Sequence, residues 1–171
     1  MTEEIANRIK VNQETYERLL KDENYTEIKF NPKNGALSAI HKAHNFDPTK
    51  GAFGIARGEY ERISFDVLYK YGNSVIMESE NLGVGKKAPE GLLNGKRFDI
   101  KGIEGVGKNN IINNIKDANR KNVESVVLYY HDKDMFSKQQ VQESYKSYYR
   151  NSKSKRIKHV YYIVDGKLHK L

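Results

Sequence analysis

The chain has 171 residues and contains no cysteine, no tryptophan and only three prolines. Without cysteine it has no disulfide, no thiolate zinc site and no cysteine nucleophile, so any metal must be bound by carboxylate, imidazole or backbone oxygen. No apolar run approaches the roughly 20 residues that span a bilayer. The N-terminal Met-Thr-Glu-Glu lacks the basic-then-apolar pattern of a signal peptide. We therefore expect a protein with no membrane anchor and no secretion signal of its own.

Acidic residues are also in deficit, since 30 Lys and Arg face 22 Asp and Glu, giving a net charge of +8 and a pI of about 9.4. The excess is concentrated at the end of the chain, where residues 138–171 hold nine basic and two acidic residues. This balance favours a polyanionic partner such as nucleic acid. Twelve tyrosines accompany it, and exposed ones among lysines can stack on unpaired bases, although many fit strand and core positions.

The apolar pattern predicts an α/β fold. The hydrophobic content of 37% and a mean hydropathy of −0.80 indicate a soluble chain long enough to bury one core. From residue 53 the expected order is helix, strand, hairpin, helix, strand, helix, strand, and a capping box at Ser137 and Gln140 begins the last helix. We expect an N-terminal helical appendage over residues 1–35 and the main domain over residues 36–171.

A β-hairpin is predicted around Asn94-Gly95, the preferred dipeptide of a two-residue type I′ turn. The register of this hairpin places Glu90 opposite Asp99, with Cβ atoms roughly 5 Å apart, and Lys101 on the same face as Asp99. Opposed carboxylates repel each other, so a divalent cation is their natural companion. Two acids and a lysine around a metal make a phosphodiester-cleaving site. The alternative is an ordinary surface hairpin that carries these charges by chance.

These residues resemble the PD-(D/E)xK motif of restriction-endonuclease-like nucleases: Pro89-Glu90, eight residues, then Asp99-Ile100-Lys101. Glu90 departs from the more common Asp and is one methylene longer, which alters the metal geometry. The resemblance implies a mixed β-sheet flanked by helices, with Glu90 and Asp99 as metal ligands and Lys101 as a catalytic residue. The family often adds an acid from the preceding helix. Glu59 fits that catalytic and metal-binding role, and it also fits a simple helix-surface pair with Arg62.

Among these nucleases, the chain most resembles the C-terminal toxin domains of contact-dependent growth inhibition and other polymorphic toxin systems. That resemblance implies cleavage of RNA, with tRNA favoured, and neutralisation by an acidic immunity protein. It also implies action in the target-cell cytoplasm after delivery as part of a larger toxin. The expected cofactor is Mg²⁺, with Zn²⁺ or Mn²⁺ as alternatives. Metal-independent cleavage stays open, because some toxin tRNases cut through the ribose 2′-OH.

Further candidates for nucleic-acid contact lie in segments that we expect to be loops or helix ends. The histidines fall in residues 36–47, read as a loop or short helix, and the glycine-rich stretch 102–108 fits only part of a Walker A loop. Asn109 replaces its Ser/Thr, so nucleotide hydrolysis is not supported. The candidates are Lys86, Lys87, Lys108, Asn109, His41 and His44. Two other functions remain open: a DNase of the same fold, and a non-catalytic nucleic-acid-binding module of a phage or mobile element.

Overall fold

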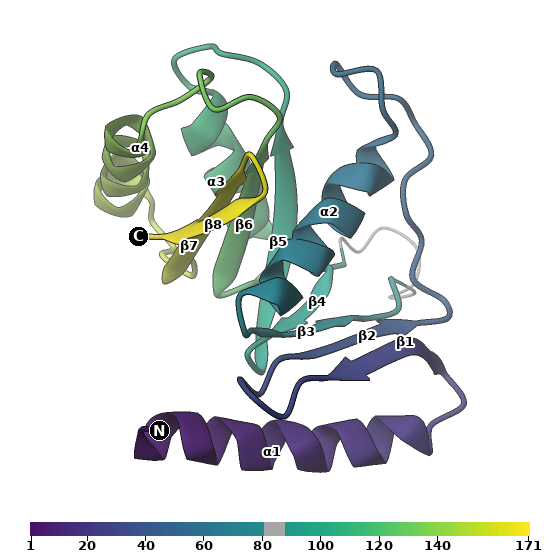
Figure 1. The fold of residues 1–171 in the computed structure, drawn as a ribbon. Coiled ribbons are helices and arrows are strands. Elements are labelled where there is room, and N and C mark those ends of the chain that lie inside the picture. Colours follow the sequence, from purple (N-terminus) through teal and green to yellow (C-terminus); the bar gives the residue numbers. More distant parts are fainter. Residues whose placement is uncertain (81–87) are drawn as a thin grey trace.

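The computed structural model describes residues 1–80 and 88–171. Over these ranges the chain forms an eight-stranded mixed β-sheet with four α-helices packed against it (Figure 1), which confirms the α/β class. None of these helices is long and apolar enough to cross a membrane. The elements are α1 (Glu3–Leu20), β1 (Tyr25–Phe30), β2 (Leu37–His41), α2 (Arg57–Lys70), β3 (Ser74–Met77), β4 (Gly91–Leu93), β5 (Lys96–Ile103), α3 (Asn110–Arg120), β6 (Ser125–Tyr130), α4 (Lys138–Asn151), β7 (His159–Val164) and β8 (Lys167–Lys170).

The strands follow one another across the sheet in chain order. Three neighbouring pairs are parallel, β2 with β3, β5 with β6 and β6 with β7, and each is joined through one helix. The other four pairs are antiparallel. Because parallel neighbours need a crossover connection, the helices that the apolar periodicity predicts between strands are the ones that this topology requires.

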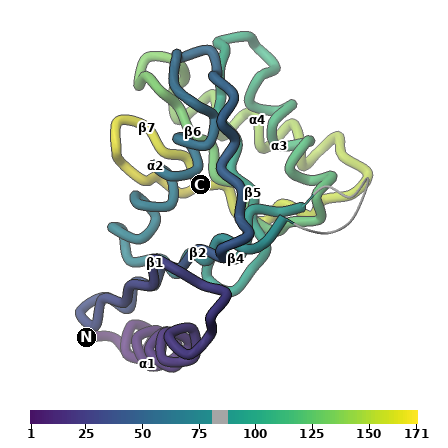
Figure 2. The backbone as a smooth tube through the Cα atoms, turned by 90° about the vertical axis from the view of Figure 1, so that its right-hand side faces the viewer, coloured from purple at the N-terminus to yellow at the C-terminus, as the bar shows by residue number. Residues whose placement is uncertain are grey.

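The helices cover both faces of the sheet, and Figure 2 shows α2 on one side and α3 with α4 on the other. The α2 face buries one core around Phe65, Met77 and Phe98. The opposite face buries a second core around Leu128 and Tyr148. A smaller cluster seats α1 against β1 and β2. Strand β6 lies between the two main cores with all six of its residues buried, in agreement with its continuous apolar sequence. The predicted capping box at the start of α4 is also present.

Two short strands differ from the expectation. Residues 36–47, expected to be a loop or short helix, contain β2, and the C-terminal tail forms β8. The first four residues of β2 are buried on both faces, so the alternation that reveals a half-buried strand is missing. Strand β1 belongs to the expected appendage and yet pairs with β2. One sheet therefore runs across the boundary at residue 35, and the division into two domains stays a prediction.

Candidate active site at the uncovered edge of β5

The candidate site lies where β5 outruns its neighbour. Strand β5 has eight residues and β4 has three, so β4 pairs only with the first part of β5, up to Phe98. Beyond that point β5 is paired on its other side, with β6. A cavity of about 280 Å³ opens beside this edge, between the first turns of α2 and the C-terminal half of α3. It is lined by Asp47, Arg57, Tyr60, Glu61, Glu90, Ile100, Lys101, Gly102, Glu104, Asn114 and Lys121.

The hairpin that carries the acids forms in the predicted register. Its turn residues Asn94 and Gly95 have φ values of 52° and 81°, as a type I′ turn requires. Gly91 pairs with Phe98, and the backbone N–H of Glu90 donates to the carbonyl of Phe98 at 3.0 Å. The next opposed position therefore holds Glu90, immediately before β4, and Asp99, in the middle of β5.

Asp99 lies at the centre of a charged network. Its carboxylate is fully buried, with Oδ1 3.0 Å from the Lys121 ammonium and Oδ2 3.2 Å from the Lys101 ammonium. Lys101 also donates to Asp117 on α3. Burial lowers the pKa of Lys101, but Asp99 and Asp117 outweigh that effect, so the pKa is raised and the side chain is a cation. A permanently charged lysine cannot act as a base, and it is suited to stabilising negative charge.

Glu90 is a buried acid of the site with an oxygen that lacks a hydrogen bond in the described part of the chain. Its side chain is 8% exposed, and its Oε2 atom accepts no hydrogen bond within the described residues. Burial first, and then the charges of Glu61 and Asp99, raise the pKa of Glu90 well above its usual value. A buried carboxylate of this kind binds either a proton or a cation.

His44 faces Glu90 from the loop after β2. Its Nδ1 atom lies 2.9 Å from the carbonyl oxygen of Glu78, and because a carbonyl can only accept, Nδ1 carries the hydrogen. Nε2 then points at Glu61, 3.4 Å away, and at Glu90, 3.7 Å away. Burial lowers the pKa of His44, but the bonds to Glu61 and Glu78 outweigh it and the pKa is raised.

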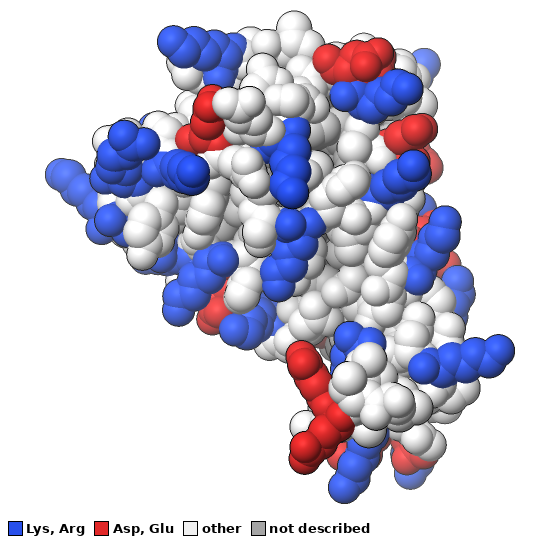
Figure 3. All heavy atoms as spheres, turned by 60° about the vertical axis from the view of Figure 1, so that its left-hand side comes forward, with Lys and Arg blue, Asp and Glu red and all other residues white. Residues whose placement is uncertain are grey.

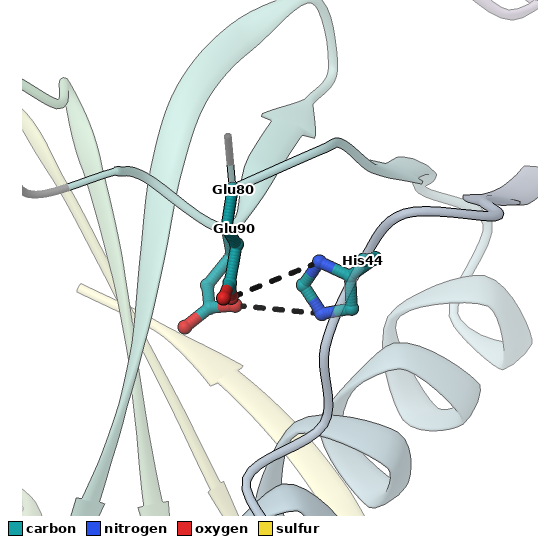
Figure 4. A group of neighbouring side chains, drawn as sticks. All are labelled: His44, Glu80 and Glu90. Carbon is teal, nitrogen blue, oxygen red and sulfur yellow. Dashed lines mark ion pairs between the residues drawn. The ribbon is translucent and has the colours of Figure 1, made fainter. Parts of the chain in front are cut away.

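His44, Glu80 and Glu90 form a group that can hold a metal ion. Their ligand atoms lie within 4.8 Å of one another, and both carboxylates point at the imidazole ring (Figure 4). The Oε2 atom of Glu90, which accepts no hydrogen bond among the described residues, supports the fit. The Glu78 carbonyl also supports it, because metal-binding histidines are commonly oriented by such an acceptor. One imidazole and two carboxylates suit Mn²⁺ and Zn²⁺ as well as Mg²⁺.

The structure brings together some of the predicted site residues. Glu90 and Lys101 line the cavity. Asp99 contacts Lys101 and His44 contacts Glu90 without lining it, whereas Glu59 is exposed on α2 and does not line it. The acid that α2 contributes is Glu61. Sequence reasoning missed it, although its spacing to the buried Ser64, Phe65 and Leu68 (i+3, i+4, i+7) was a usable signal.

Most other candidates for nucleic-acid contact lie away from the cavity. His41 ends β2, where its Nδ1 accepts from the N–H of Ala43 at 3.0 Å. Lys108 and Asn109 line a separate hollow of about 490 Å³ between α3 and α4. Lys86 and Lys87 lie outside the described residues. Two further charged groups of the network, Asp117 and Lys121, were not predicted, although they are four residues apart and therefore share one side of α3 and its C-cap.

Gly102 sets the width of the cavity, because a Cβ atom there would lie 2.2 Å from the ring of Tyr60, which stacks on Tyr129. We expect Gly102→Ala to destabilise the fold by about 1–3 kcal/mol through overpacking and to lower the melting temperature measured by circular dichroism. Gly107→Ala is the matched control, since its Cβ meets nothing closer than 3.5 Å. Equal melting of the two variants would show that Tyr60 moves aside freely.

Comparison with known families addresses the half of the chain that carries the hairpin. Residues 86–168 match the model of the contact-dependent growth inhibition CdiA C-terminal domain. This CdiA C-terminal segment is just under half of the chain and contains Glu90, Asp99 and Lys101. The match supports the contact-dependent growth inhibition toxin family. It does not address the PD-(D/E)xK subtype, and neither the curated proteins nor the solved structures gave a match.

Proposed function

We propose that this chain is a metal-dependent nuclease toxin that cleaves RNA, with tRNA as the favoured substrate. The observation that carries the proposal is the cavity beside β5, which is lined by Glu90 and the cationic Lys101, with Asp99 in contact with Lys101. The match of residues 86–168 to a CdiA C-terminal domain supports a toxin. RNA rather than DNA follows from the resemblance to tRNA-cleaving toxins.

The residues divide into two groups in this proposal. His44, Glu80 and Glu90 hold the divalent cation, which when bound supplies a Lewis acid and an activated water. Lys101 contributes a fixed positive charge where negative charge develops on the phosphate. Asp99 has an ammonium group at each of its oxygens, so we assign it to positioning Lys101 and Lys121. In this proposal the acid that α2 contributes to the cavity is Glu61 rather than Glu59, which the motif resemblance suggested.

The biological setting follows from the family. We propose that the domain acts in the cytoplasm of the target cell after delivery as part of a larger toxin. An immunity protein with an acidic surface is the expected partner, because the chain carries a net charge of +8. The compartment rests on the match of residues 86–168, and the acidic partner rests on that match together with the net charge.

The test is cleavage of total tRNA and of plasmid DNA by the purified chain, with and without EDTA. We expect tRNA fragments, intact plasmid, and loss of cleavage in EDTA that Mg²⁺, Mn²⁺ or Zn²⁺ restores. Cleavage of plasmid alone would show that the site belongs to a DNase and not to an RNase. Undiminished cleavage in EDTA would remove the cation from the mechanism, and no cleavage of either substrate would favour a non-catalytic binding module.

A further inference from the structure

A second surface of the molecule has the properties of a nucleic-acid platform. Residues 144–158, from the second half of α4 into the segment before β7, contain six basic residues and no acidic residue. All six are exposed, and none pairs with a carboxylate in the part of the chain that the structure describes. We call this the α4 basic surface. Its members are Lys146, Arg150, Lys153, Lys155, Arg156 and Lys158.

Figure 3 shows where these charges lie. Lys and Arg side chains gather at the left edge of that view, on the side of the molecule that carries α4. Side chains that repel one another without acids between them create a positive potential. A phosphate backbone is the partner that such a potential attracts most strongly.

An exposed aromatic ring lies within this surface. Tyr149 is 52% exposed, with the Lys155 ammonium 4.7 Å from its ring centroid. The ring helps to line a hollow of about 470 Å³ together with Tyr145, Lys146 and Arg150. A flat ring, a guanidinium and ammonium groups around one hollow are the combination that holds unpaired bases and their phosphates.

The neighbouring tyrosines have structural roles that Tyr149 does not share. The Tyr145 hydroxyl donates to the carbonyl of Ile157 at 2.9 Å. The Tyr148 hydroxyl donates to Asn119 at 2.6 Å and accepts from the N–H of Ile157 at 3.2 Å. These bonds fasten the basic segment to α4 and α3. The hydroxyl of Tyr149 has no such bond among the described residues. Its ring lies 6.2 Å from that of Tyr145, centroid to centroid, and the residue is still 52% exposed.

We propose that Tyr149 stacks on an unpaired base of a single-stranded RNA segment, while Arg150 and Lys155 bind the flanking phosphates. This inference rests on the proposed function for the identity of the ligand. It accounts for exposure, charge and ring together, whereas an acidic protein partner would need only the charges. The platform distinguishes loops and ends from paired helices, because only unpaired bases present a free face for stacking.

Helix α3 connects this platform to the cavity. Asn119 donates to the carbonyl of Ser154 at 3.1 Å and accepts from the N–H of Arg156 at 3.0 Å, which ties the basic segment to the end of α3. Two residues later, Lys121 lines the cavity and contacts Asp99. A single-stranded RNA bound to the α4 basic surface is thereby directed around the end of α3 towards Glu90 and Asp99.

The test is fluorescence anisotropy in EDTA with the full chain and a labelled 2′-O-methyl oligoribonucleotide, as a single strand and as a duplex of equal length. EDTA prevents cation-dependent cleavage of the probe, and the methyl group prevents cleavage through the 2′-OH. Tyr149→Ala should weaken single-strand binding at least about fivefold, the effect of losing one stacked base, and leave duplex binding unchanged. Tyr149→Phe should bind normally. Lys155→Ala should weaken the binding of both probes. It should also reduce the slope of log affinity against log salt concentration for the single strand by about 0.7.

The control is Tyr71→Ala, which removes another exposed tyrosine, 47% exposed at the end of α2. It should leave both affinities unchanged. Unchanged single-strand binding by Tyr149→Ala, or equal loss on both probes, would overturn the platform and leave a charge-only surface for a duplex or an acidic protein. The probe is not cleaved, so these outcomes are independent of the nuclease assay: a chain that cuts RNA but ignores Tyr149 refutes the platform alone.

Discussion

Lys101→Met is expected to lower the rate of RNA cleavage by at least about a hundredfold, the effect typical of removing one preorganised charge from a transition state. The substitution keeps the length of the side chain and removes a charge that Asp99 and Asp117 share. Single-turnover cleavage of tRNA on a gel measures the rate. Asp99→Asn should cause a similar loss, because it releases Lys101 and Lys121 from their common anchor.

The control for Lys101→Met is Lys96→Met on the same strand. Lys96 lies at the start of β5, half exposed, and pairs with Glu124 at 3.5 Å, away from the cavity. The Lys96→Met variant should cleave tRNA at the native rate. Circular dichroism and thermal melting verify that each variant is folded. Native activity in folded Lys101→Met and Asp99→Asn would leave the nuclease proposal without its site.

Glu90→Gln is expected to abolish cation binding and to remove the stabilisation that a cation gives. For the native chain, Mn²⁺ at a hundred times its dissociation constant stabilises the fold by about 2.7 kcal/mol, roughly 5–10 °C in melting temperature for a chain of this length. The variant should melt at one temperature with or without Mn²⁺. Differential scanning calorimetry and titration calorimetry measure both effects.

In the metal-free protein, Glu90→Gln is expected to increase the stability of the fold at high pH. The pKa of Glu90 is raised in the folded state, so the folded chain binds this proton more tightly than the unfolded chain does. Stability therefore falls as the pH rises from the usual range of a glutamate to the raised pKa of Glu90. In EDTA, Glu90→Gln should be more stable than the native chain above that window, with a flatter dependence of melting temperature on pH.

The control for Glu90→Gln is Glu59→Gln, which alters an exposed glutamate of α2. It should respond to Mn²⁺ as the native chain does. A response to Mn²⁺ that survives Glu90→Gln but is lost in Glu59→Gln would restore the ligand that the motif resemblance suggested. A native chain that does not respond to Mn²⁺, Mg²⁺ or Zn²⁺ would contradict the cation site altogether.

The central hairpin was predictable because its information is local. Asn94-Gly95 fixes the turn, and a two-residue turn fixes the register, so Glu90 and Asp99 had to become neighbours. Strand β6 and the capping box of α4 were predictable for the same reason. Strand β2 was not, because its pairing with β3 comes from a distant partner rather than from its own pattern. Strand β8 was missed although its turn at Asp165 and Gly166 is also local, because only one of its four residues, Leu168, is apolar.

The residues that contact the hairpin acids are brought there by long-range packing, so local sequence patterns do not predict them. His44 and Glu80 meet Glu90 because the loop after β2 and the end of β3 reach the same edge of the sheet, across 46 and 10 positions of sequence. The choice between Glu59 and Glu61 depends on the rotation of α2 about its axis. A difference of two positions turns a side chain by about 200°, from solvent to the cavity.

The sheet that continues across both parts of the chain bears on where the chain can be divided. A fragment restricted to the CdiA C-terminal segment would retain the hairpin and Lys101 but would leave out His44, Glu61 and Glu80, which all precede residue 86. Such a fragment would also remove β3 from beside β4 and α2 from beside β5. We therefore expect the smallest unit that retains the proposed activity to be larger than the segment that matches the CdiA C-terminal domain.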